Sequence, residues 1–327
     1  MAWQHTKTSK RRRKKKIAKA IFGKSLPLVM VLVLLLGVLF GLAYSTFEPV
    51  RDFVDGLGII STSQTTKPRP IIDPEGDTMA VHFIDVGQGD STLFQTPKGS
   101  VLVDCGESEY GDDVVAYLKA QGVTELEYFI ITHPDSDHMG CAAYVLQNIK
   151  VKNFVMNGQE KSTKFFEKAL DELEKQEIEG IIAVPGDVIT VGALTIEILG
   201  PQRLDFKEAD WNNASLILHA TYGLHSFLLT GDAEEEGEED LLKKYASSLK
   251  CDVFSAGHHG SKTSNSLELL QAADPDFVVI SCGEGNSYGH PHQGALDVFS
   301  KIGATVYRTD KEGSIVFTTD GKTLTKN

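Results

Sequence analysis

The amino-acid sequence predicts an α/β fold of four layers, αββα, in which helices cover the outer faces of two mixed sheets, preceded by one transmembrane helix. From residue 79 onward, groups of short β-type runs alternate with helical patterns, as expected for mixed sheets with helices between groups of strands. Thirty glycines in 327 residues suit many tight strand–loop junctions. Residues 25–47 carry no charge, and as a helix these 23 residues would cross about 30 Å of hydrocarbon.

The N-terminal region is predicted to be a membrane anchor behind a basic tail. Residues 1–24 hold ten Lys/Arg and no acid, and the apolar span 25–47 follows directly. Because basic residues stay on the cytoplasmic side, this predicts a single-pass protein of the cell membrane whose folded domain is extracytoplasmic. The tail would also contact anionic lipid. A cleaved signal peptide is the alternative, since Ala43-Tyr44-Ser45 resembles a small-x-small cleavage site.

Residues 48–78 are predicted to be a linker, and residues 79–327 a single domain. The linker holds Pro, Ser, Thr and Gly without sustained periodicity. In the first half of the domain, strands are predicted at 80–86, 91–96, 100–105, 128–132 and 152–156, with helices at 111–121, 141–148 and 162–177. In the second half, strands are predicted at 181–184, 188–191, 194–199, 214–221, 225–230, 252–256, 277–281, 304–308 and 314–318, with helices at 234–248, 266–273 and 293–302.

Composition and charge exclude several classes of protein. With 41% apolar and 24% charged residues, the chain fits neither wholesale disorder nor a membrane protein of many spans. From residue 25 onward 22 Lys/Arg face 45 Asp/Glu, a net charge of −23, which excludes a globally basic nucleic-acid binder. The four cysteines show no CxxC spacing, so a disulfide scaffold and a cysteine zinc knuckle are also excluded.

The most informative motif is the sequence His133-Pro134-Asp135-Ser136-Asp137-His138, which directly follows an apolar strand. It places four side chains of the ligand type within six residues. Imidazole and carboxylate groups at this density suit one or two divalent cations. An Asx-rich turn that caps the following helix is the alternative, but two histidines are not needed for such a turn.

This H-x-D-x-D-H motif resembles the H-x-H-x-D-H signature of the metallo-β-lactamase superfamily, with Asp135 where the second histidine usually stands. Asp104, at the end of an early strand, matches the aspartate that supports the metal-binding histidines of that superfamily. Asp232 matches the aspartate that bridges two metals. His258 and His259 follow a later strand and supply the last imidazole.

Further segments resemble the hydrolase domain of the ComEC/Rec2 competence proteins over about residues 79–320. The matching segments are Asp85-Val86-Gly87-Gln88-Gly89-Asp90-Ser91, Asn212-Asn213-Ala214-Ser215-Leu216, Gly257-His258-His259-Gly260-Ser261 and Tyr288-Gly289-His290-Pro291. The large multi-span channel part of the DNA-uptake proteins is missing from the sequence, so the resemblance implies the hydrolase rather than transport.

The resemblance implies a binuclear site for two divalent cations, zinc or manganese. The first metal would be held by three side chains and the second by four, with one carboxylate shared: His133, Asp135 and Asp232 for the first, and Asp137, His138, His258 and Asp232 for the second. The third histidine that the superfamily places on the first metal is not visible, because His219 lies inside a strand. A site with more carboxylate than imidazole is harder, so manganese competes with zinc.

Other residues are assigned supporting roles by the same resemblance. Asp137, Asp232 and His259 are the candidate catalytic residues. Asn213, His290 and Gln88 are candidates for substrate binding, and Gln88 and Asp90 are both placed to face the metals from their Gly-rich turn. Asp104 and Asp85 are expected to support the ligands from behind.

These features together predict a membrane-anchored, extracytoplasmic hydrolase in which a metal-bound hydroxide attacks a phosphodiester. Single-stranded DNA is the substrate that the resemblance favours. The preference over small phosphodiesters, such as phosphocholine-type esters, is only slight, because the domain charge of −23 opposes tight binding of long polyanions. A lactamase or lactonase would keep a histidine at Asp135. A non-catalytic module that binds DNA or a surface polymer is the alternative from a different class. The sequence does not identify the protein partners.

Overall fold

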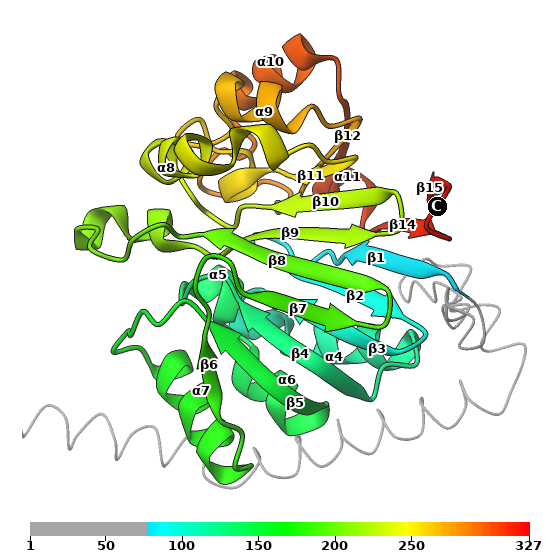
Figure 1. Cartoon of the computed structure of the whole chain (residues 1–327). Helices are drawn as coiled ribbons and strands as arrows, with labels where there is room; N and C mark the ends of the chain where they lie inside the picture. Colours follow the sequence, from blue (N-terminus) through cyan, green and yellow to red (C-terminus); the bar gives the residue numbers. More distant parts are fainter. Residues whose placement is uncertain (1–76) are drawn as a thin grey trace, which may run out of the picture. The chain divides into compact units, whose positions relative to one another are not determined.

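The computed structural model describes residues 77–327, apart from the side chains of residues 208–210. Its strands form two sheets that pack face to face (Figure 1). The predicted tail 1–24, the anchor 25–47 and nearly all of the linker 48–78 lie outside the described residues. Within residues 77–327, no helix is both long enough and apolar enough to cross a membrane.

The first sheet has the strand order β15-β14-β1-β2-β3-β4-β5-β6. Strands β1 to β3 form antiparallel pairs, whereas β3 to β6 are parallel to one another. The bounds of its strands are β1 (Met79–Phe83), β2 (Thr92–Thr96), β3 (Gly99–Val103), β4 (Glu125–Ile131), β5 (Lys150–Met156), β6 (Gly180–Ile182), β14 (Ile315–Thr319) and β15 (Leu324–Lys326).

The second sheet has the order β13-β12-β11-β10-β9-β8-β7. Its strands β7 to β10 are antiparallel and β10 to β13 parallel. The bounds are β7 (Val188–Val191), β8 (Leu194–Gly200), β9 (Ile217–Tyr222), β10 (His225–Leu229), β11 (Val253–Ser255), β12 (Phe277–Ile280) and β13 (Thr305–Arg308). Both sheets are therefore mixed, as predicted.

Helices cover the outer face of each sheet (Figure 1). Three pack on the first sheet in one apolar cluster: α4 (Gly111–Ala120), α6 (Ala142–Asn148) and α7 (Lys164–Lys175). Three others pack on the second sheet: α8 (Glu235–Tyr245), α9 (Leu267–Ala273) and α10 (Gln293–Ile302). In α7, Phe166, Ala169 and Leu173 recur at helical spacing and are all buried, which explains why this charged segment folds as a helix. The αββα architecture is confirmed.

The core between the sheets is formed by residues that alternate along the strands and point inward from both sides. Phe94 of β2 and Phe227 of β10 meet there edge to face, with ring centroids 6.0 Å apart. Both side chains are fully buried. This contact joins the two sheets and therefore sets the distance between the strand ends that carry the site described below.

Short segments that the sequence did not predict lie close to the strand ends. They are the helices α5 (Ser136–Met139) and α11 (Thr309–Glu312), and the 3-10 turns η1 (Ser108–Tyr110), η2 (Glu208–Ala214) and η4 (Gly257–Gly260). A further 3-10 turn, η3 (Ala246–Ser248), lies within a predicted helix. The turn η2 delays the start of β9 to Ile217, and η3 forms the last part of the predicted helix 234–248. Strand β15 was also not predicted.

Removing the contact between the sheets should destabilise the whole domain. Phe227→Ala deletes a ring that is packed from both sheets, so we expect the free energy of unfolding to fall by about 3–5 kcal/mol. Leu224→Ala, at a side chain that is 78% exposed in the turn after β9, should change it by less than about 0.5 kcal/mol. Urea denaturation followed by circular dichroism measures both values. Equal losses for the two variants would contradict this packing.

Candidate metal centre

Six loops meet at one edge of the molecule, where strands of both sheets end (Figure 1). They follow β1, β3 and β4 in the first sheet, and β10, β11 and β12 in the second. Because parallel strands end on the same side, polar residues just beyond those strands are brought together although they are far apart in the sequence. The residues predicted to bind metal lie in these loops.

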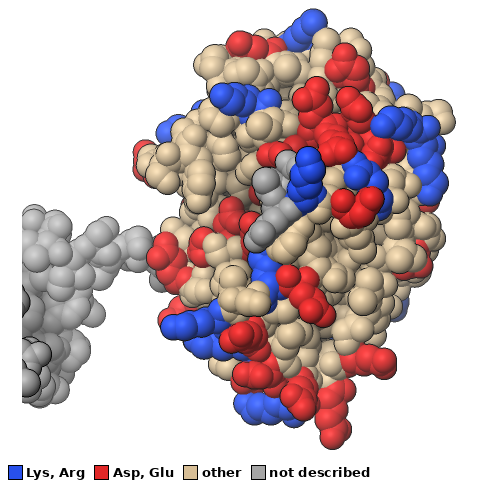
Figure 2. Space-filling view, turned by 90° about the vertical axis from the view of Figure 1, so that its left-hand side faces the viewer, with Lys and Arg blue, Asp and Glu red and all other residues tan. Residues whose placement is uncertain are grey.

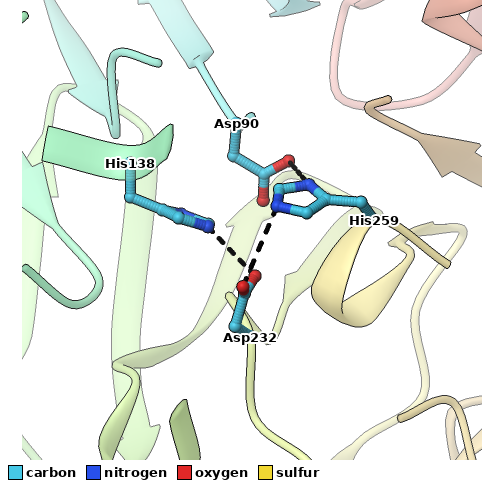
Figure 3. A group of neighbouring side chains, drawn as sticks. All are labelled: Asp90, His138, Asp232 and His259. Carbon is cyan, nitrogen blue, oxygen red and sulfur yellow. Dashed lines mark ion pairs between the residues drawn. The ribbon is translucent and has the colours of Figure 1, made fainter. Parts of the chain in front are cut away.

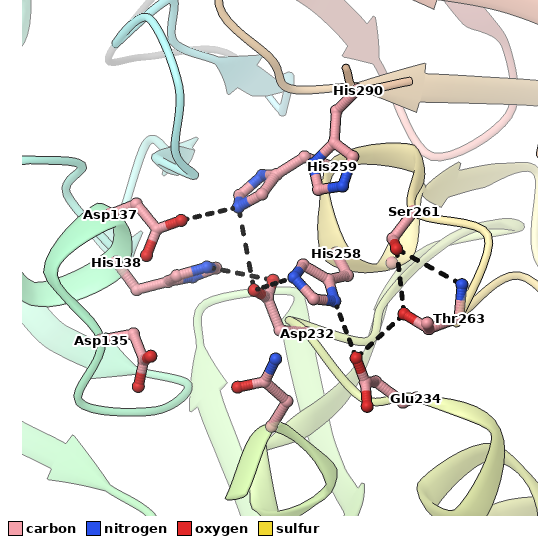
Figure 4. A network of polar contacts seen from close by, with 12 residues as sticks. Asp135, Asp137, His138, Asp232, Glu234, His258, His259, Ser261, Thr263 and His290 are labelled. Atoms are coloured by element: carbon pink, nitrogen blue, oxygen red, sulfur yellow. Dashed lines mark hydrogen bonds and ion pairs between the residues drawn. The ribbon is translucent and has the colours of Figure 1, made fainter. Parts of the chain in front are cut away.

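The loop after β4 carries the H-x-D-x-D-H motif. Its histidines are buried, with His133 only 1% and His138 0% exposed. Asp135 precedes α5, and Asp137 and His138 lie within this short helix. The turn of α5 therefore sends Asp135 and Asp137 to opposite sides of the His138 ring (Figure 4).

Asp104, which follows β3, fixes the orientation of His138. Its Oδ2 accepts a hydrogen bond from His138 Nδ1 at 2.8 Å, and its two oxygens also accept from the backbone N–H and the hydroxyl of Thr132 at 2.8 and 2.7 Å. With Nδ1 engaged in this way, His138 presents Nε2 to the centre of the site. This is the arrangement that orients a histidine for a metal.

Asp232, three residues beyond the end of β10 at Leu229, lies at the middle of the cluster (Figure 3). Its side chain is 4% exposed. Oδ1 is 3.0 Å from His138 Nε2, and Oδ2 is 3.6 Å from His258 Nε2. The Nε2 atoms of His133 and His259 are each 3.8 Å from Oδ2. One carboxylate thus faces four imidazoles.

His258 and His259 follow β11 in the turn η4, and both have left-handed backbone conformations, with φ of 50° and 55°. The side chain of Asn265 holds this turn, because it accepts from the N–H of Gly257 at 2.8 Å and donates to the carbonyls of Gly257 and Ser261 at 2.9 and 3.1 Å. Two consecutive left-handed residues turn neighbouring imidazoles toward the centre from different angles (Figure 4).

Glu238 of α8 supports the same turn from below. Its buried carboxylate accepts from the backbone N–H groups of Asn265 at 2.5 Å and Ser266 at 2.9 Å. Burial raises the pKa of Glu238. Neither Asn265 nor Glu238 was singled out in the sequence. Their signal is weak, since an asparagine with φ of 68° and a glutamate in an acidic helix start are ordinary features of loops and helices.

A group of four buried side chains has the geometry of a cation site. One ligand atom from each of Asp90, His138, Asp232 and His259 lies within 4.8 Å of all the others (Figure 3). Asp90 comes from the Gly-rich turn after β1, where Gly89 approaches the backbone of Asp137 so closely that a Cβ would lie 2.4 Å from its carbonyl oxygen. Of the two residues in this turn that were expected to face the metals, Asp90 joins the cluster.

The group predicted for the first metal also converges, but less tightly. His133 Nε2 lies 3.8 Å from Asp135 Oδ1 and 3.8 Å from Asp232 Oδ2. Asp135 is 34% exposed and forms a short ion pair with Lys161. Sequence reasoning did not consider Lys161, which lies in a loop without a motif.

The group predicted for the second metal is arranged differently from the expectation. His138 and Asp232 lie in the cluster of four, together with His259 rather than His258. His258 stands beside Asp232, and its Nδ1 lies 3.2 Å from Glu234 Oε1. Asp137 borders the cluster, with its Oδ2 at 3.1 Å from His259 Nε2.

Several buried atoms in this cluster make no hydrogen bond of good geometry within the described part of the chain, although His138 Nε2 and Asp232 Oδ1 approach each other to 3.0 Å as an ion pair. They are His133 Nε2, His138 Nε2, Asp90 Oδ1 and Asp232 Oδ1. Leaving such atoms unpaired is costly, and each is a ligand atom aimed at the same small volume. A divalent cation would satisfy them, so the residues present fit a metal.

The electrostatics of the cluster follow from burial and mutual proximity. Burial alone would raise the pKa of Asp232, but the imidazoles of His138 and His259 hold it well below its usual range. Burial alone would lower the pKa of His138, but the carboxylates of Asp232 and Asp104 raise it well above its ordinary value. Burial and the neighbouring His138 lower the pKa of His133. Asp232 therefore remains ionised, as cation binding requires, whereas His138 must release its proton when a cation binds.

Two of the residues predicted to bind substrate, His290 and Gln88, lie next to each other. His290 is 8% exposed, and burial together with His259 and His258 lowers its pKa to about 4, so it is neutral. Gln88 Nε2 lies 3.5 Å from His290 Nδ1, and Gln88 Oε1 accepts from the N–H of Gly283 at 3.2 Å.

Asn213 and Asp85 make local contacts. Asn213 Oδ1 accepts from the backbone N–H groups of Glu234 and Gly237 at 3.0 and 2.8 Å, which fixes the start of α8 beside Asp232. Asp85 accepts from the N–H of Gly87 at 3.1 Å and thereby shapes the Gly-rich turn.

A cavity of about 1040 Å³ opens beside the cluster on the side of Asp137. Its walls come from the loops after β1, β3 and β12 and from α11. Most of its charged lining is acidic, namely Asp85, Glu107, Glu109, Asp113, Asp137, Glu284 and Asp310. Figure 2 shows acidic side chains in and around a hollow on the face of the molecule.

The sequence model of the metallo-beta-lactamase superfamily matches residues 84–284, a span that contains the whole cluster. The chain belongs to the metallo-beta-lactamase superfamily. The metallo-beta-lactamase fold protein YhfI from Bacillus subtilis has a similar fold, with a TM-score of 0.50 and 17% sequence identity over 74% of this chain and 100% of that one.

Within the metallo-beta-lactamase superfamily, the chain is similar to competence and recombination proteins. It is 35% identical to ComE operon protein 3 of Bacillus subtilis, over 76% of this chain and 34% of that protein. It is 33% identical to competence protein ComA of Neisseria gonorrhoeae, over 76% of this chain and 33% of that protein. Recombination protein 2 of Haemophilus influenzae is 30% identical over 73% of this chain and 28% of its own length. The chain thus spans about a third of these relatives.

The contact between Asp104 and His138 should control metal affinity. Asp104 has a φ of 56°, which asparagine tolerates, so Asp104→Asn should preserve the backbone while it weakens the orientation of His138. We expect Mn²⁺ affinity to fall by about 10–100-fold in equilibrium dialysis. Asp274→Asn makes the same chemical change at an exposed aspartate that also has a left-handed backbone, with φ of 42°, and should leave the affinity unchanged. The same affinity in both variants would show that Asp104 does not support a metal ligand.

Proposed function

We propose that the chain is a metal-dependent hydrolase of phosphodiesters that uses two divalent cations, zinc or manganese. The observation that carries this proposal is the buried cluster around Asp232, in which ligand atoms of four side chains lie within 4.8 Å of one another. Membership of the metallo-beta-lactamase superfamily supports it, since proteins of this superfamily are mostly metal-dependent hydrolases and often bind two metals.

One cation would be held by Asp90, His138, Asp232 and His259, and the other by His133, Asp135 and Asp232. Bound divalent cations supply an acidified water as nucleophile and offset the negative charge that develops on the phosphoryl oxygens. Carboxylates from three loops make the site harder than a three-histidine zinc site, which supports manganese as a competitor of zinc.

The protein groups around the cluster would position the reactants. Asp137 borders both the cluster and the cavity, with Oδ2 engaged by His259. Burial alone would raise the pKa of Asp137, but the hydrogen bond from His259 and the nearby His138 hold it below its usual range, so the carboxylate stays ionised and can accept a hydrogen bond from the attacking water. His259 is held from behind by the carbonyl oxygen of Ser281, 3.1 Å from its Nδ1. His290, beside Gln88 of the cavity wall, is neutral and can donate a hydrogen bond to the substrate or accept one from it.

Single-stranded DNA is the substrate that we favour. The names of the similar proteins refer to competence and recombination, which are processes that handle DNA. A small phosphodiester is the second candidate, and the acidic lining of the cavity beside Asp137 favours it, because long polyanions are repelled from such a surface.

We further propose that the hydrolase is attached to the cell membrane by residues 25–47 and faces outward. The ten basic residues before this apolar stretch support that orientation.

Asp232→Ala should abolish hydrolysis. Asp232 is the carboxylate that both proposed ligand groups share, so its loss removes a ligand from each of them. Turnover of bis(p-nitrophenyl) phosphate should fall to the level of the protein treated with a chelator, while the circular dichroism spectrum is retained. Glu239→Ala removes an exposed carboxylate on α8 and should keep the wild-type rate. Near wild-type turnover by Asp232→Ala would refute the two-metal hydrolase, and binding without turnover in the wild type would favour a non-catalytic module.

The orientation can be tested on intact, wall-stripped cells. Protease added from outside should degrade the domain, and added substrate should be hydrolysed without lysis. If the domain is fully protected and activity appears only after lysis, the hydrolase faces the cytoplasm and the proposed topology is wrong.

A further inference from the structure

A lysine and a tryptophan lie next to Asp135, and neither has a role in the hydrolysis proposed above. Lys161 Nζ pairs with Asp135 Oδ1, and the same Nζ lies 5.8 Å from the centroid of the Trp211 ring. Both side chains are partly exposed. A cation and an aromatic ring therefore stand together directly beside a proposed metal ligand.

Hydrogen bonds join the two loops that present these side chains. The buried Asn157, which follows β5, donates to the carbonyl of Ala214 at 2.8 Å and accepts from the N–H of Gln159 at 3.0 Å. Gln159 Nε2 then donates to the carbonyl of Trp211 at 3.2 Å. The loop of Lys161 and the turn of Trp211 thus form one wall, and their pairing is built into the fold.

The wall formed by Lys161 and Trp211 differs in charge from the acidic surfaces around the rest of the site. Asp135 and Asp137 lie on opposite sides of His138 (Figure 4), and the cavity on the Asp137 side is strongly acidic, with Lys311 the one cation among the described residues that line it. A second cavity, near Glu234, is lined by four glutamates and Lys262. A polyanion that reaches the metals would therefore avoid these two cavities and approach past Lys161.

We propose that Lys161 and Trp211 bind one nucleotide of a single-stranded nucleic acid at the metal centre: the ammonium of Lys161 binds a phosphate, and the indole of Trp211 stacks on the base. This inference rests on the proposed function and adds the residues that select a nucleotide. An ammonium has three N–H donors, so Lys161 can keep Asp135 and still bind a phosphate oxygen. Stacking on an aromatic ring beside a cation is how proteins bind single strands without reading their sequence.

Phosphate binding by Lys161 and base stacking on Trp211 can be distinguished by measuring the affinity for two phosphorothioate strands, which resist hydrolysis. The strands are a fluorescein-labelled oligothymidylate and an abasic backbone of the same length, and anisotropy is measured with the full chain in Mn²⁺. Trp211→Ala and Trp211→Leu should each weaken binding of the oligothymidylate about tenfold and leave binding of the abasic strand unchanged.

Lys161→Ala should weaken binding of both strands, because both have the phosphate. It should also reduce the slope of log Kd against log salt concentration by about 0.7, the amount expected for one phosphate contact on a single strand. Lys161→Arg should restore most of the affinity. Lys311→Ala, which removes the same charge on the other side of the cluster, should leave both affinities and the slope unchanged.

The fluorescence of Trp211 can also show whether a base stacks on this residue. The chain has two tryptophans, Trp3 and Trp211, so Trp3→Phe leaves Trp211 as the single indole. Oligothymidylate should quench the fluorescence of this variant, and the abasic strand should not.

The proposal is overturned if Lys161→Ala and Trp211→Ala bind oligothymidylate as well as the wild type, or if Lys311→Ala loses as much affinity as Lys161→Ala. Failure of the proposed function has a different signature, namely no release of p-nitrophenol by the wild type. In that case reduced binding by the Lys161 and Trp211 variants would still support the nucleotide site.

Discussion

The carboxylate of Asp232 is the group on which the arrangement of the site depends. It is buried, it comes from the second sheet, and two of the imidazoles that surround it, His133 and His138, come from the first. An isolated carboxylate at this depth would be strongly destabilising, so it requires cationic or metal partners. The packing of the two sheets, which Phe94 and Phe227 join, brings those partners within reach.

The site is also held by backbone conformations that are unfavourable on their own. Asp104, His258 and His259 have φ values of 56°, 50° and 55°, and each such residue costs about 1–3 kcal/mol. The surrounding structure maintains them, through the contacts of Asp104 with the loop after β4 and of Asn265 with the turn η4. The ligand atoms are therefore aimed at the cluster before any cation binds, which reduces the reorganisation that binding requires.

The sequence predicted the layers of the fold and the loops of the site, because alternation along strands and ligand residues at strand ends are local patterns. It could not distinguish His258 from His259, since adjacent histidines differ only in a left-handed backbone that the sequence does not reveal. Nor could it rank Asp90 above Gln88 in the same turn. Lys161 and Trp211 remained unnoticed because their pairing depends on Asn157, a contact between loops distant in sequence.

The charged side chains are unevenly distributed around the metal centre, and this distribution affects which substrates can approach it. Carboxylates that would hold cations also repel an anionic substrate, and the wall formed by Lys161 and Trp211 is the proposed route on which that repulsion is smallest. The central claim, that the cluster around Asp232 holds two divalent cations, is tested most directly by counting Mn²⁺ bound to the full chain after equilibrium dialysis, with the metal measured by mass spectrometry. We predict two tightly bound ions per wild-type chain. A wild-type chain that retains one ion or none would contradict the account.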